Sequence, residues 1–256
     1  MRFASLASGS RGNCLVAEAG PTRVLVDCGL AARETERRLA RRGLTPRDLT
    51  GILLTHEHED HVGGAFSFAQ QHALTVYLTH GTLQAVREAG RIGSTATRVI
   101  DGRVGFDLDG LHVRPFTVPH DAREPVQYVL SDGAFSLAVL TDLGASTSHV
   151  EQMLSGCDAL VLECNHDLDM LRAGNYPPRL KERIAGPFGH LDNGASARLL
   201  GAIDRSRLKH VIGAHLSEKN NRPELAREAL AGALGCNPEG VSLASQEDGF
   251  DWRELR

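Results

Sequence analysis

Four side chains of types that bind metal ions lie close together directly after an apolar run. They are His56, His58, Asp60 and His61, and the apolar run is residues 51–55. In extended backbone, His56 and His58 point to the same side and can converge on one cation. Asp60 and His61 can then supply a carboxylate and an imidazole to a second ion. The run predicts a dinuclear metal site, although a polar loop at a helix entry is the simpler alternative.

Three more residues of ligand type follow other apolar runs. They are His120, Asp142 and His215, which come after residues 111–118, 135–141 and 211–214. Functional residues often lie where strands end, so we expect these three to approach the first four. Asp142 can give one carboxylate oxygen to each of two cations, or it can be a turn residue. Imidazoles and carboxylates without clustered thiolates favour a catalytic site for two divalent ions, manganese or zinc, with iron also acceptable.

Composition limits the class of protein that carries these residues. The chain has 256 residues, of which 41% are hydrophobic and 23% charged, so we expect one globular domain over residues 1–256. The net charge of −4 predicts that any contact with nucleic acid is local. No apolar run is long enough to span a bilayer. Five widely spaced cysteines, Cys14, Cys28, Cys157, Cys164 and Cys236, indicate buried thiols in a reducing compartment, the cytoplasm.

Short apolar runs alternate with polar helical stretches along the chain. The expected strands are residues 23–27, 51–55, 75–79, 111–118, 126–130, 135–141, 159–163 and 210–214. The expected helices are residues 31–42, 64–71, 82–88, 146–154, 195–203 and 223–234. This α/β pattern fits two packed sheets with helices outside, and it also fits one doubly wound sheet. Periodicity does not choose between the two architectures.

The order and spacing of the seven ligand-type residues resemble the metallo-β-lactamase fold superfamily, over nearly the whole chain. The resemblance implies an αββα sandwich, in which two mixed β-sheets are flanked by helices. It also implies two metal sites that share Asp142: His56, His58 and His120 at one, and Asp60, His61 and His215 at the other. The superfamily contains lactamases, thioesterases, oxidoreductases and nucleases, so the fold alone leaves the substrate open.

Five further blocks narrow the resemblance. They are residues 8–14, 162–167, 176–184, 189–193 and 215–221, and they are similar to the YycJ/WalJ (VicX) family. This similarity implies a bacterial, metal-dependent DNA exonuclease that acts 5′ to 3′, with DNA repair as a setting. The family lacks the inserted domain of larger nucleases, and here only 22 positions separate His120 from Asp142.

A phosphodiesterase of this kind uses two cations about 3.5–4 Å apart, which hold a bridging hydroxide and neutralise the phosphate. Asp60 lies inside the histidine cluster and is expected to act both as a ligand and as the carboxylate that orients the water. His190 lies in a glycine-flanked loop and is the candidate for a contact to phosphate or for protonating the leaving oxygen. Asp192 or Asn193 beside it can instead cap the following helix. The two roles are compatible.

Several other polar residues are candidates for contacts to a nucleic-acid substrate, with DNA favoured. Asn165 and His166 end an expected strand, and a structural histidine is the alternative for His166. Lys181 belongs to a basic stretch with Arg172, Arg179 and Arg183, which can form a local phosphate-binding patch or a solvated helix face. Ser217 and Asn220 lie beside His215 and can bind a terminal phosphate or shape the loop.

Three other functions remain to be weighed against a DNA exonuclease. The same metal cage can cut RNA, and it can activate water against the carbonyl of a small thioester or other ester. A regulatory binding module that has kept the fold is the non-enzymatic alternative. Because a pure binder has no need for all seven ligand-type residues, the sequence favours a hydrolase.

Overall fold

The strands form two seven-stranded sheets in the computed structural model, which describes residues 1–256. The first sheet has the order β14 (Phe250–Glu254), β1 (Arg2–Ala7), β2 (Cys14–Ala19), β3 (Thr22–Val26), β4 (Gly51–Leu53), β5 (Thr75–Thr79) and β6 (Thr97–Ile100). The second has the order β13 (Ser242–Leu243), β12 (His210–Ala214), β11 (Ala159–Glu163), β10 (Ser136–Leu140), β9 (Val126–Ser131), β8 (Leu111–Thr117) and β7 (Phe106–Leu108). Both sheets contain parallel and antiparallel pairs.

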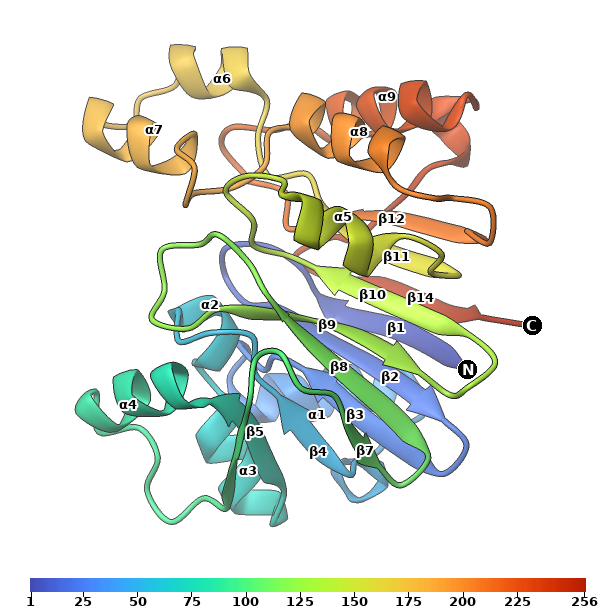
Figure 1. Cartoon of the computed structure of the whole chain (residues 1–256). Helices are drawn as coiled ribbons and strands as arrows, with labels where there is room; N and C mark the ends of the chain where they lie inside the picture. The colour runs from blue at the N-terminus through green and yellow to red at the C-terminus, as the bar shows by residue number, and fades with distance from the viewer.

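Nine α-helices accompany the sheets (Figure 1). They are α1 (Ala32–Arg41), α2 (Glu59–Val62), α3 (Ala65–His72), α4 (His80–Glu88), α5 (Ser148–Leu154), α6 (Leu168–Ala173), α7 (Pro178–Ile184), α8 (Asn193–Ala202) and α9 (Pro223–Leu234). Two short 3₁₀ helices cover Pro46–Asp48 and Pro238–Gly240. Side chains of α1, α3 and α4 pack on the outer face of the first sheet, and those of α5, α8 and α9 pack on the outer face of the second. The layers are therefore α, β, β, α, as the resemblance implied.

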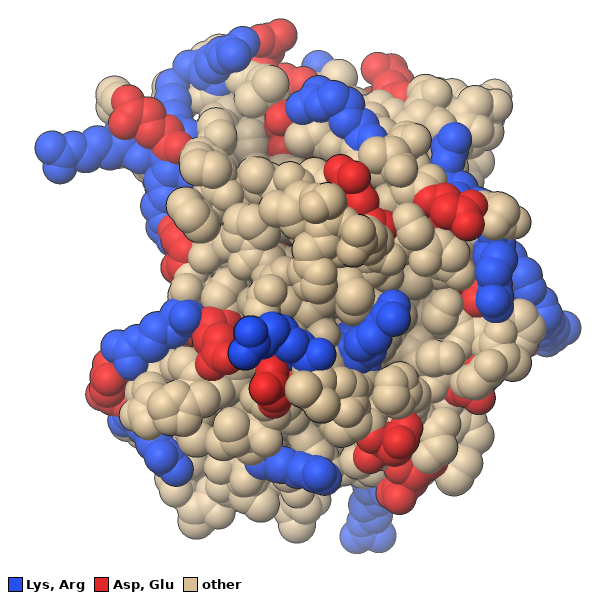
Figure 2. Space-filling view, viewed as in Figure 1, with Lys and Arg blue, Asp and Glu red and all other residues tan.

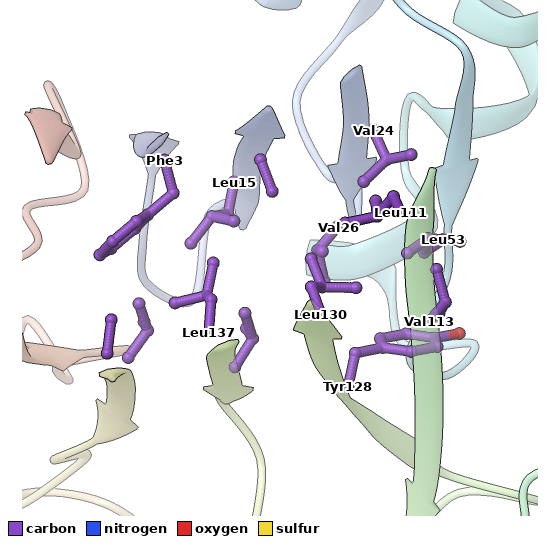
Figure 3. Packing of buried hydrophobic residues seen from close by; sticks show 14 of the residues in the cluster. Phe3, Leu15, Val24, Val26, Leu53, Leu111, Val113, Tyr128, Leu130 and Leu137 are labelled. Carbon is purple, nitrogen blue, oxygen red and sulfur yellow. The ribbon is translucent and has the colours of Figure 1, made fainter. Parts of the chain in front are cut away.

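The alternation of side chains along each strand produces this layering. In β3, Val24 and Val26 face the second sheet, whereas Leu25 between them faces the helices. Figure 3 shows the inner layer, where Val24 and Val26 lie among apolar side chains from both sheets. Burying one such large apolar side chain contributes about 1.5–3 kcal/mol. Tyr128 of this layer donates its hydroxyl to the Leu54 carbonyl at 2.6 Å, which ties the second sheet to the exit of β4.

The parallel strands direct several chain segments to one edge of the sandwich. In the first sheet β3 and β4 run parallel, and in the second β10, β11 and β12 run parallel. Because β8 and β10 both pair antiparallel with β9, β8 ends at the same edge as β10. The carboxyl ends of parallel strands are where α/β proteins place their ligand sites. The residues that follow β4, β8, β10 and β12 are therefore brought close together.

The expected elements differ from the observed ones mainly at the weak strands. All eight expected strands and all six expected helices are present, with ends shifted by at most a few residues. The strands β1, β2, β6, β7, β13 and β14 and the helices α2, α6 and α7 were not predicted. Alanine and serine are frequent in β1 and β2, and these residues lack the β-branched signal of a strand. The unpredicted helices have seven residues or fewer.

The cysteine prediction is wrong at one position. Cys14, Cys28, Cys157 and Cys164 are buried free thiols, whereas Cys236 is exposed. Cys236 follows Gly235, which ends α9 with φ of +68°, so the chain turns at the surface there. None of the helices is long and apolar enough to cross a membrane.

Candidate metal centre

The loop after β4 brings four ligand-type side chains together within a few residues. His56 and His58 approach each other with ring centroids 4.5 Å apart, as extended backbone predicts. The short helix α2 then turns the chain back, so that the His61 ring lies 4.2 Å from the His56 ring. Asp60 is fixed through its backbone carbonyl, which accepts from the Asn13 amide at 2.7 Å. A β-carbon on Gly29 would lie 1.8 Å from the same carbonyl, so only glycine fits there.

The three ligand-type residues from later strand ends join this loop. His120 Nε2 lies 3.3 Å from His58 Nδ1, and His215 Nε2 lies 3.3 Å from Asp60 Oδ2. Asp142 Oδ2 lies 3.0 Å from His61 Nε2. All seven residues predicted to surround the metals are therefore close together in the structure.

Two groups of three residues in this cluster could each hold a metal ion, with ligand atoms within 4.8 Å of one another. One group is His56, His58 and His120, and the other is Asp60, His61 and His215. Asp142 belongs to further groups of this kind, with His56 and His61 and also with Glu163, His190 and His215. A carboxylate in this position touches both halves of the cluster.

The contacts within the cluster fit a metal ion better than they fit hydrogen bonds. His56 Nε2 is buried and has no hydrogen-bond partner. Although His61 Nε2 and Asp142 Oδ2 are close, Asp142 Oδ2 makes no hydrogen bond. Buried polar atoms without partners are costly, and a bound cation would satisfy them. The donor set of imidazoles and carboxylates suits divalent metals.

The electrostatics of the cluster differ between its two groups. Burial lowers the pKa of His56 well below its ordinary value and also lowers the pKa of His58, so both rings are neutral and have a free lone pair. Burial by itself would lower the pKa of His61 too, but the carboxylates of Asp60 and Asp142 raise it well above the ordinary value. A cation binds the deprotonated ring, so a proton and a metal ion compete for His61.

Asp27, directly after β3, contacts the His61 ring on the side away from Asp142 and was not predicted. Its Oδ2 lies 2.8 Å from His61 Nδ1, and it also accepts from the amide and the hydroxyl of Thr55. Burial raises the pKa of Asp27. A carboxylate on the second ring nitrogen fixes the orientation of a metal-binding histidine. The available signal was an aspartate at the end of the expected strand 23–27.

Glu163, at the end of β11, is the second residue of the site that was not predicted. This fully buried carboxylate lies 2.8 Å from His190 Nδ1 and 3.2 Å from His215 Nδ1. It also accepts from the amides of Leu143 and Leu191. Burial alone would raise the pKa of Glu163, but the His190 ring lowers it. Its sequence signals were an acid at the end of an apolar run and a place in the family-like block 162–167, neither of which assigned it a role.

His190 lies at the edge of the cluster, with Asp142 Oδ1 3.3 Å from its Nδ1. Burial by itself would lower the pKa of His190, but the Glu163 carboxylate raises it above the ordinary value. The helix-cap interpretation of the neighbouring residues is also confirmed, because Asp192 Oδ1 accepts from the Ala195 amide at the start of α8.

Asn165 and His166 lie next to this part of the site, where β11 ends. Asn165 donates to the His215 carbonyl at 3.0 Å, and its Oδ1 lies 3.3 Å from His166 Nδ1. The other ring nitrogen of His166 is buried and has no partner.

The remaining predicted substrate contacts lie farther out. Lys181 is half-buried on α7 and donates to the Arg172 carbonyl at 2.6 Å. The Ser217 hydroxyl accepts from the Asn220 amide at 3.2 Å, so this pair shapes the loop after β12. Figure 2 shows Lys and Arg side chains projecting from the region of α6 and α7, beside a hollow at the left edge of the molecule.

Comparisons with known proteins agree with this geometry. Residues 22–212 match the family described as "Beta-lactamase superfamily domain". The chain is 35% identical to Exodeoxyribonuclease YycJ of Bacillus anthracis, covering 95% of this chain and 93% of the relative. It is 32% identical to Exodeoxyribonuclease WalJ of Streptococcus pneumoniae serotype 2, covering 94% and 91%.

Among solved structures, the Zn²⁺-bound PqqB from Methylobacterium extorquens superposes with a TM-score of 0.77 at 19% identity, with all of both chains covered. At this identity the likeness shows the fold alone. The fold and the cluster are those of a metal-dependent hydrolase. The chain belongs to the β-lactamase superfamily and, within it, to the YycJ/WalJ family.

Proposed function

We propose that this chain is a metal-dependent exonuclease that removes nucleotides from DNA ends in the 5′ to 3′ direction. The observation that carries the proposal is the buried histidine and carboxylate cluster, in a chain 35% identical over almost its full length to a relative named as an exodeoxyribonuclease. Trimming of DNA ends fits a role in DNA repair. Such a substrate fits the cytoplasm, as do five free thiols.

Two divalent ions are proposed for the cluster, with manganese or zinc as the native metal and iron as an acceptable substitute. His56, His58 and His120 would hold one ion, and Asp60, His61 and His215 would hold the other, with Asp142 between them. When bound, divalent cations supply Lewis-acid activation of water and neutralise charge on the phosphate. The chain's own residues then have to position the substrate, orient the water and move a proton.

Asp60 and His190 are the proposed catalytic residues. Asp60 is one-fifth exposed, so its carboxylate reaches solvent, where it can orient the attacking water as well as hold an ion. His190 is protonated more readily than a free histidine, because Glu163 lies against its Nδ1. A protonated His190 can donate to the oxygen that leaves when the phosphodiester breaks.

We also propose five residues as contacts to the substrate, although most of their side chains already form hydrogen bonds within the protein. Asn165, His166, Ser217 and Asn220 lie around His215 and would contact the phosphate or sugar nearest the cluster. Lys181 on α7 would contact the sugar–phosphate backbone of the DNA farther from the cluster.

The test is degradation of DNA and RNA labelled at the 5′ or the 3′ end, with Mn²⁺, Mg²⁺ or Zn²⁺ supplied to purified protein. We expect a DNA ladder that starts from the 5′ end, and no ladder from an Asp142→Ala variant. Preferred cutting of RNA would replace the proposal with a ribonuclease. A metal-loaded protein that cuts neither nucleic acid but hydrolyses thioesters would replace it with a small-molecule hydrolase.

A further inference from the structure

Phe188 is a large apolar side chain left on the surface. Its exposure is 59%, and the other exposed large apolar side chains are Val99 at 49% and Val104 at 59%. None of the three apolar clusters of the fold includes it. An exposed phenylalanine contributes little hydrophobic stabilisation to the fold. Its ring is therefore free to contact a ligand.

The backbone of Phe188 lies beside the metal centre. Its carbonyl accepts from the Asp121 amide at 3.0 Å, and the Asp121 carboxylate lies 3.8 Å from His58 Nε2. The next residue, Gly189, accepts from His120 Nδ1 through its carbonyl at 3.0 Å. Phe188 is thus one or two contacts away from two proposed ligands of the same ion.

The loop that carries the ring is held tightly on both sides. A β-carbon on Gly144 would lie 2.3 Å from the Pro187 carbonyl oxygen, so the two backbones are in direct contact. A β-carbon on Gly189 would lie 2.2 Å from the carbonyl oxygen of Ile184, at the end of α7. The backbone around Phe188 is therefore fixed by packing next to the residues that contact His120 and Asp121.

Basic side chains follow the same side of the molecule. Arg179 is exposed and Lys181 is half-buried on α7, and Arg183 of the same helix pairs with Asp121. Proteins that bind single-stranded nucleic acid combine a basic surface along the backbone with aromatic rings on which bases stack. A paired base inside a duplex has both faces covered by its neighbours, so a protein ring can stack only on an unpaired or terminal base.

We propose that Phe188 is a positioning residue that stacks on an unpaired base close to the cleaved phosphodiester. This inference rests on the proposed nuclease function and names its substrate class, a single-stranded or frayed DNA end. Stacking does not read the base by hydrogen bonds, so the contact is tolerant of sequence.

The experiment combines Phe188 variants with DNA that lacks one base. Metal-loaded protein is given 3′-labelled single-stranded oligonucleotides, either intact or with an abasic nucleotide at the first, second or third position from the 5′ end. For the unchanged protein we expect a loss of about tenfold or more in kcat/KM at one of these positions. Phe188→Ala is expected to lose a similar factor in kcat/KM on intact DNA. Its kcat/KM on that abasic substrate should be only slightly lower than on intact DNA. Phe188→Trp should keep the rate.

Two controls separate stacking from other causes. Phe188→Leu keeps an apolar side chain without a π-face and should behave as Phe188→Ala does. Val99→Ala removes another exposed apolar side chain, on the edge strand β6, and should leave the rate unchanged. Thermal unfolding of each variant shows that it is folded.

If the loss in kcat/KM of Phe188→Ala on the abasic substrate equals the product of the two separate losses, the ring and the base act independently and the stacking proposal is overturned. A Phe188→Ala rate equal to that of the unchanged protein also overturns it. In either case the nuclease proposal stands, because the unchanged protein still cuts DNA. A protein that cuts neither DNA nor RNA overturns both.

Discussion

The metal cluster and the α6–α7 segment lie near each other but are built in opposite ways. In the cluster, His56, His61 and Asp142 are almost fully buried and are held from several directions. On α7, no residue is buried, and Lys181 bonds to a backbone carbonyl of α6. A residue held by many contacts tolerates little change, whereas an exposed one tolerates much. The fold therefore holds the residues of the cluster closely, whereas it constrains the side chains of α7, where we propose a contact to the substrate, much less.

The largest expected effect comes from removing the carboxylate at the centre of the cluster. Asp142→Ala should lose metal and reduce DNA cleavage by about 10³-fold or more, because several kcal/mol of transition-state stabilisation depend on bound metal. Metal content and cleavage of labelled DNA are measured on the same sample. Asp251→Ala removes an exposed carboxylate on β14 and serves as the control. A metal-free Asp142→Ala protein with full activity would contradict the assignment.

The second effect tests the Glu163–His190 pair. Glu163→Gln should lower the rate by about 10- to 100-fold. The Glu163 carboxylate raises the pKa of His190, so replacing it with an amide lowers that pKa. His190 then loses the proton that the leaving oxygen needs at a lower pH than in the unchanged protein. The alkaline limb of the pH–rate profile should therefore move to lower pH, which a purely structural defect would not cause. Glu239→Gln, on the surface, should leave the profile in place.

The third effect compares two Asp–His pairs of equal length in different surroundings. Asp27 and His61 are buried at 2.8 Å, and Asp107 and His112 are exposed at 2.8 Å. Asp27→Asn should weaken metal binding by about 10- to 100-fold, because it loosens the orientation of a ligand ring. Asp107→Asn should have no effect. Metal titration of both variants measures the difference, and equal affinities would remove Asp27 from the site.

The smallest effect belongs to the exposed helix. Replacing Arg179 and Lys181 together with alanine should raise KM for DNA by roughly threefold to tenfold at low salt and less at high salt, with little change in kcat. Arg103→Ala, in the loop before β7, removes an exposed cation far from α7 in the chain. If the double variant and this control behave alike at every salt concentration, α7 does not bind the substrate.

The same contrast explains what could be predicted from the sequence. The seven ligand-type residues follow apolar strands, so both their type and their place pointed to the cluster. Asp27 follows β3 and Glu163 ends β11, but an acid at a strand end carries no sign of its partner, and only the structure shows the histidines that the two residues contact.

Away from the cluster the sequence carried less information. The strands β1 and β2 are rich in alanine, and their pairing depends on neighbours far along the chain. The exposure of Phe188 depends on how its loop packs against Gly144, which no local pattern encodes. The organisation of residues 1–256 as one domain stays a prediction.

The central claim is that the buried cluster is a metal centre, and a count of bound metal tests it most directly. Purified protein is loaded with Mn²⁺ or Zn²⁺, freed of excess ions and measured by elemental analysis, alongside Asp142→Ala. We expect two divalent ions per chain in the unchanged protein and a clear loss in the variant. Equal metal content in the two proteins, or DNA cleavage by protein that holds no metal, would contradict the claim.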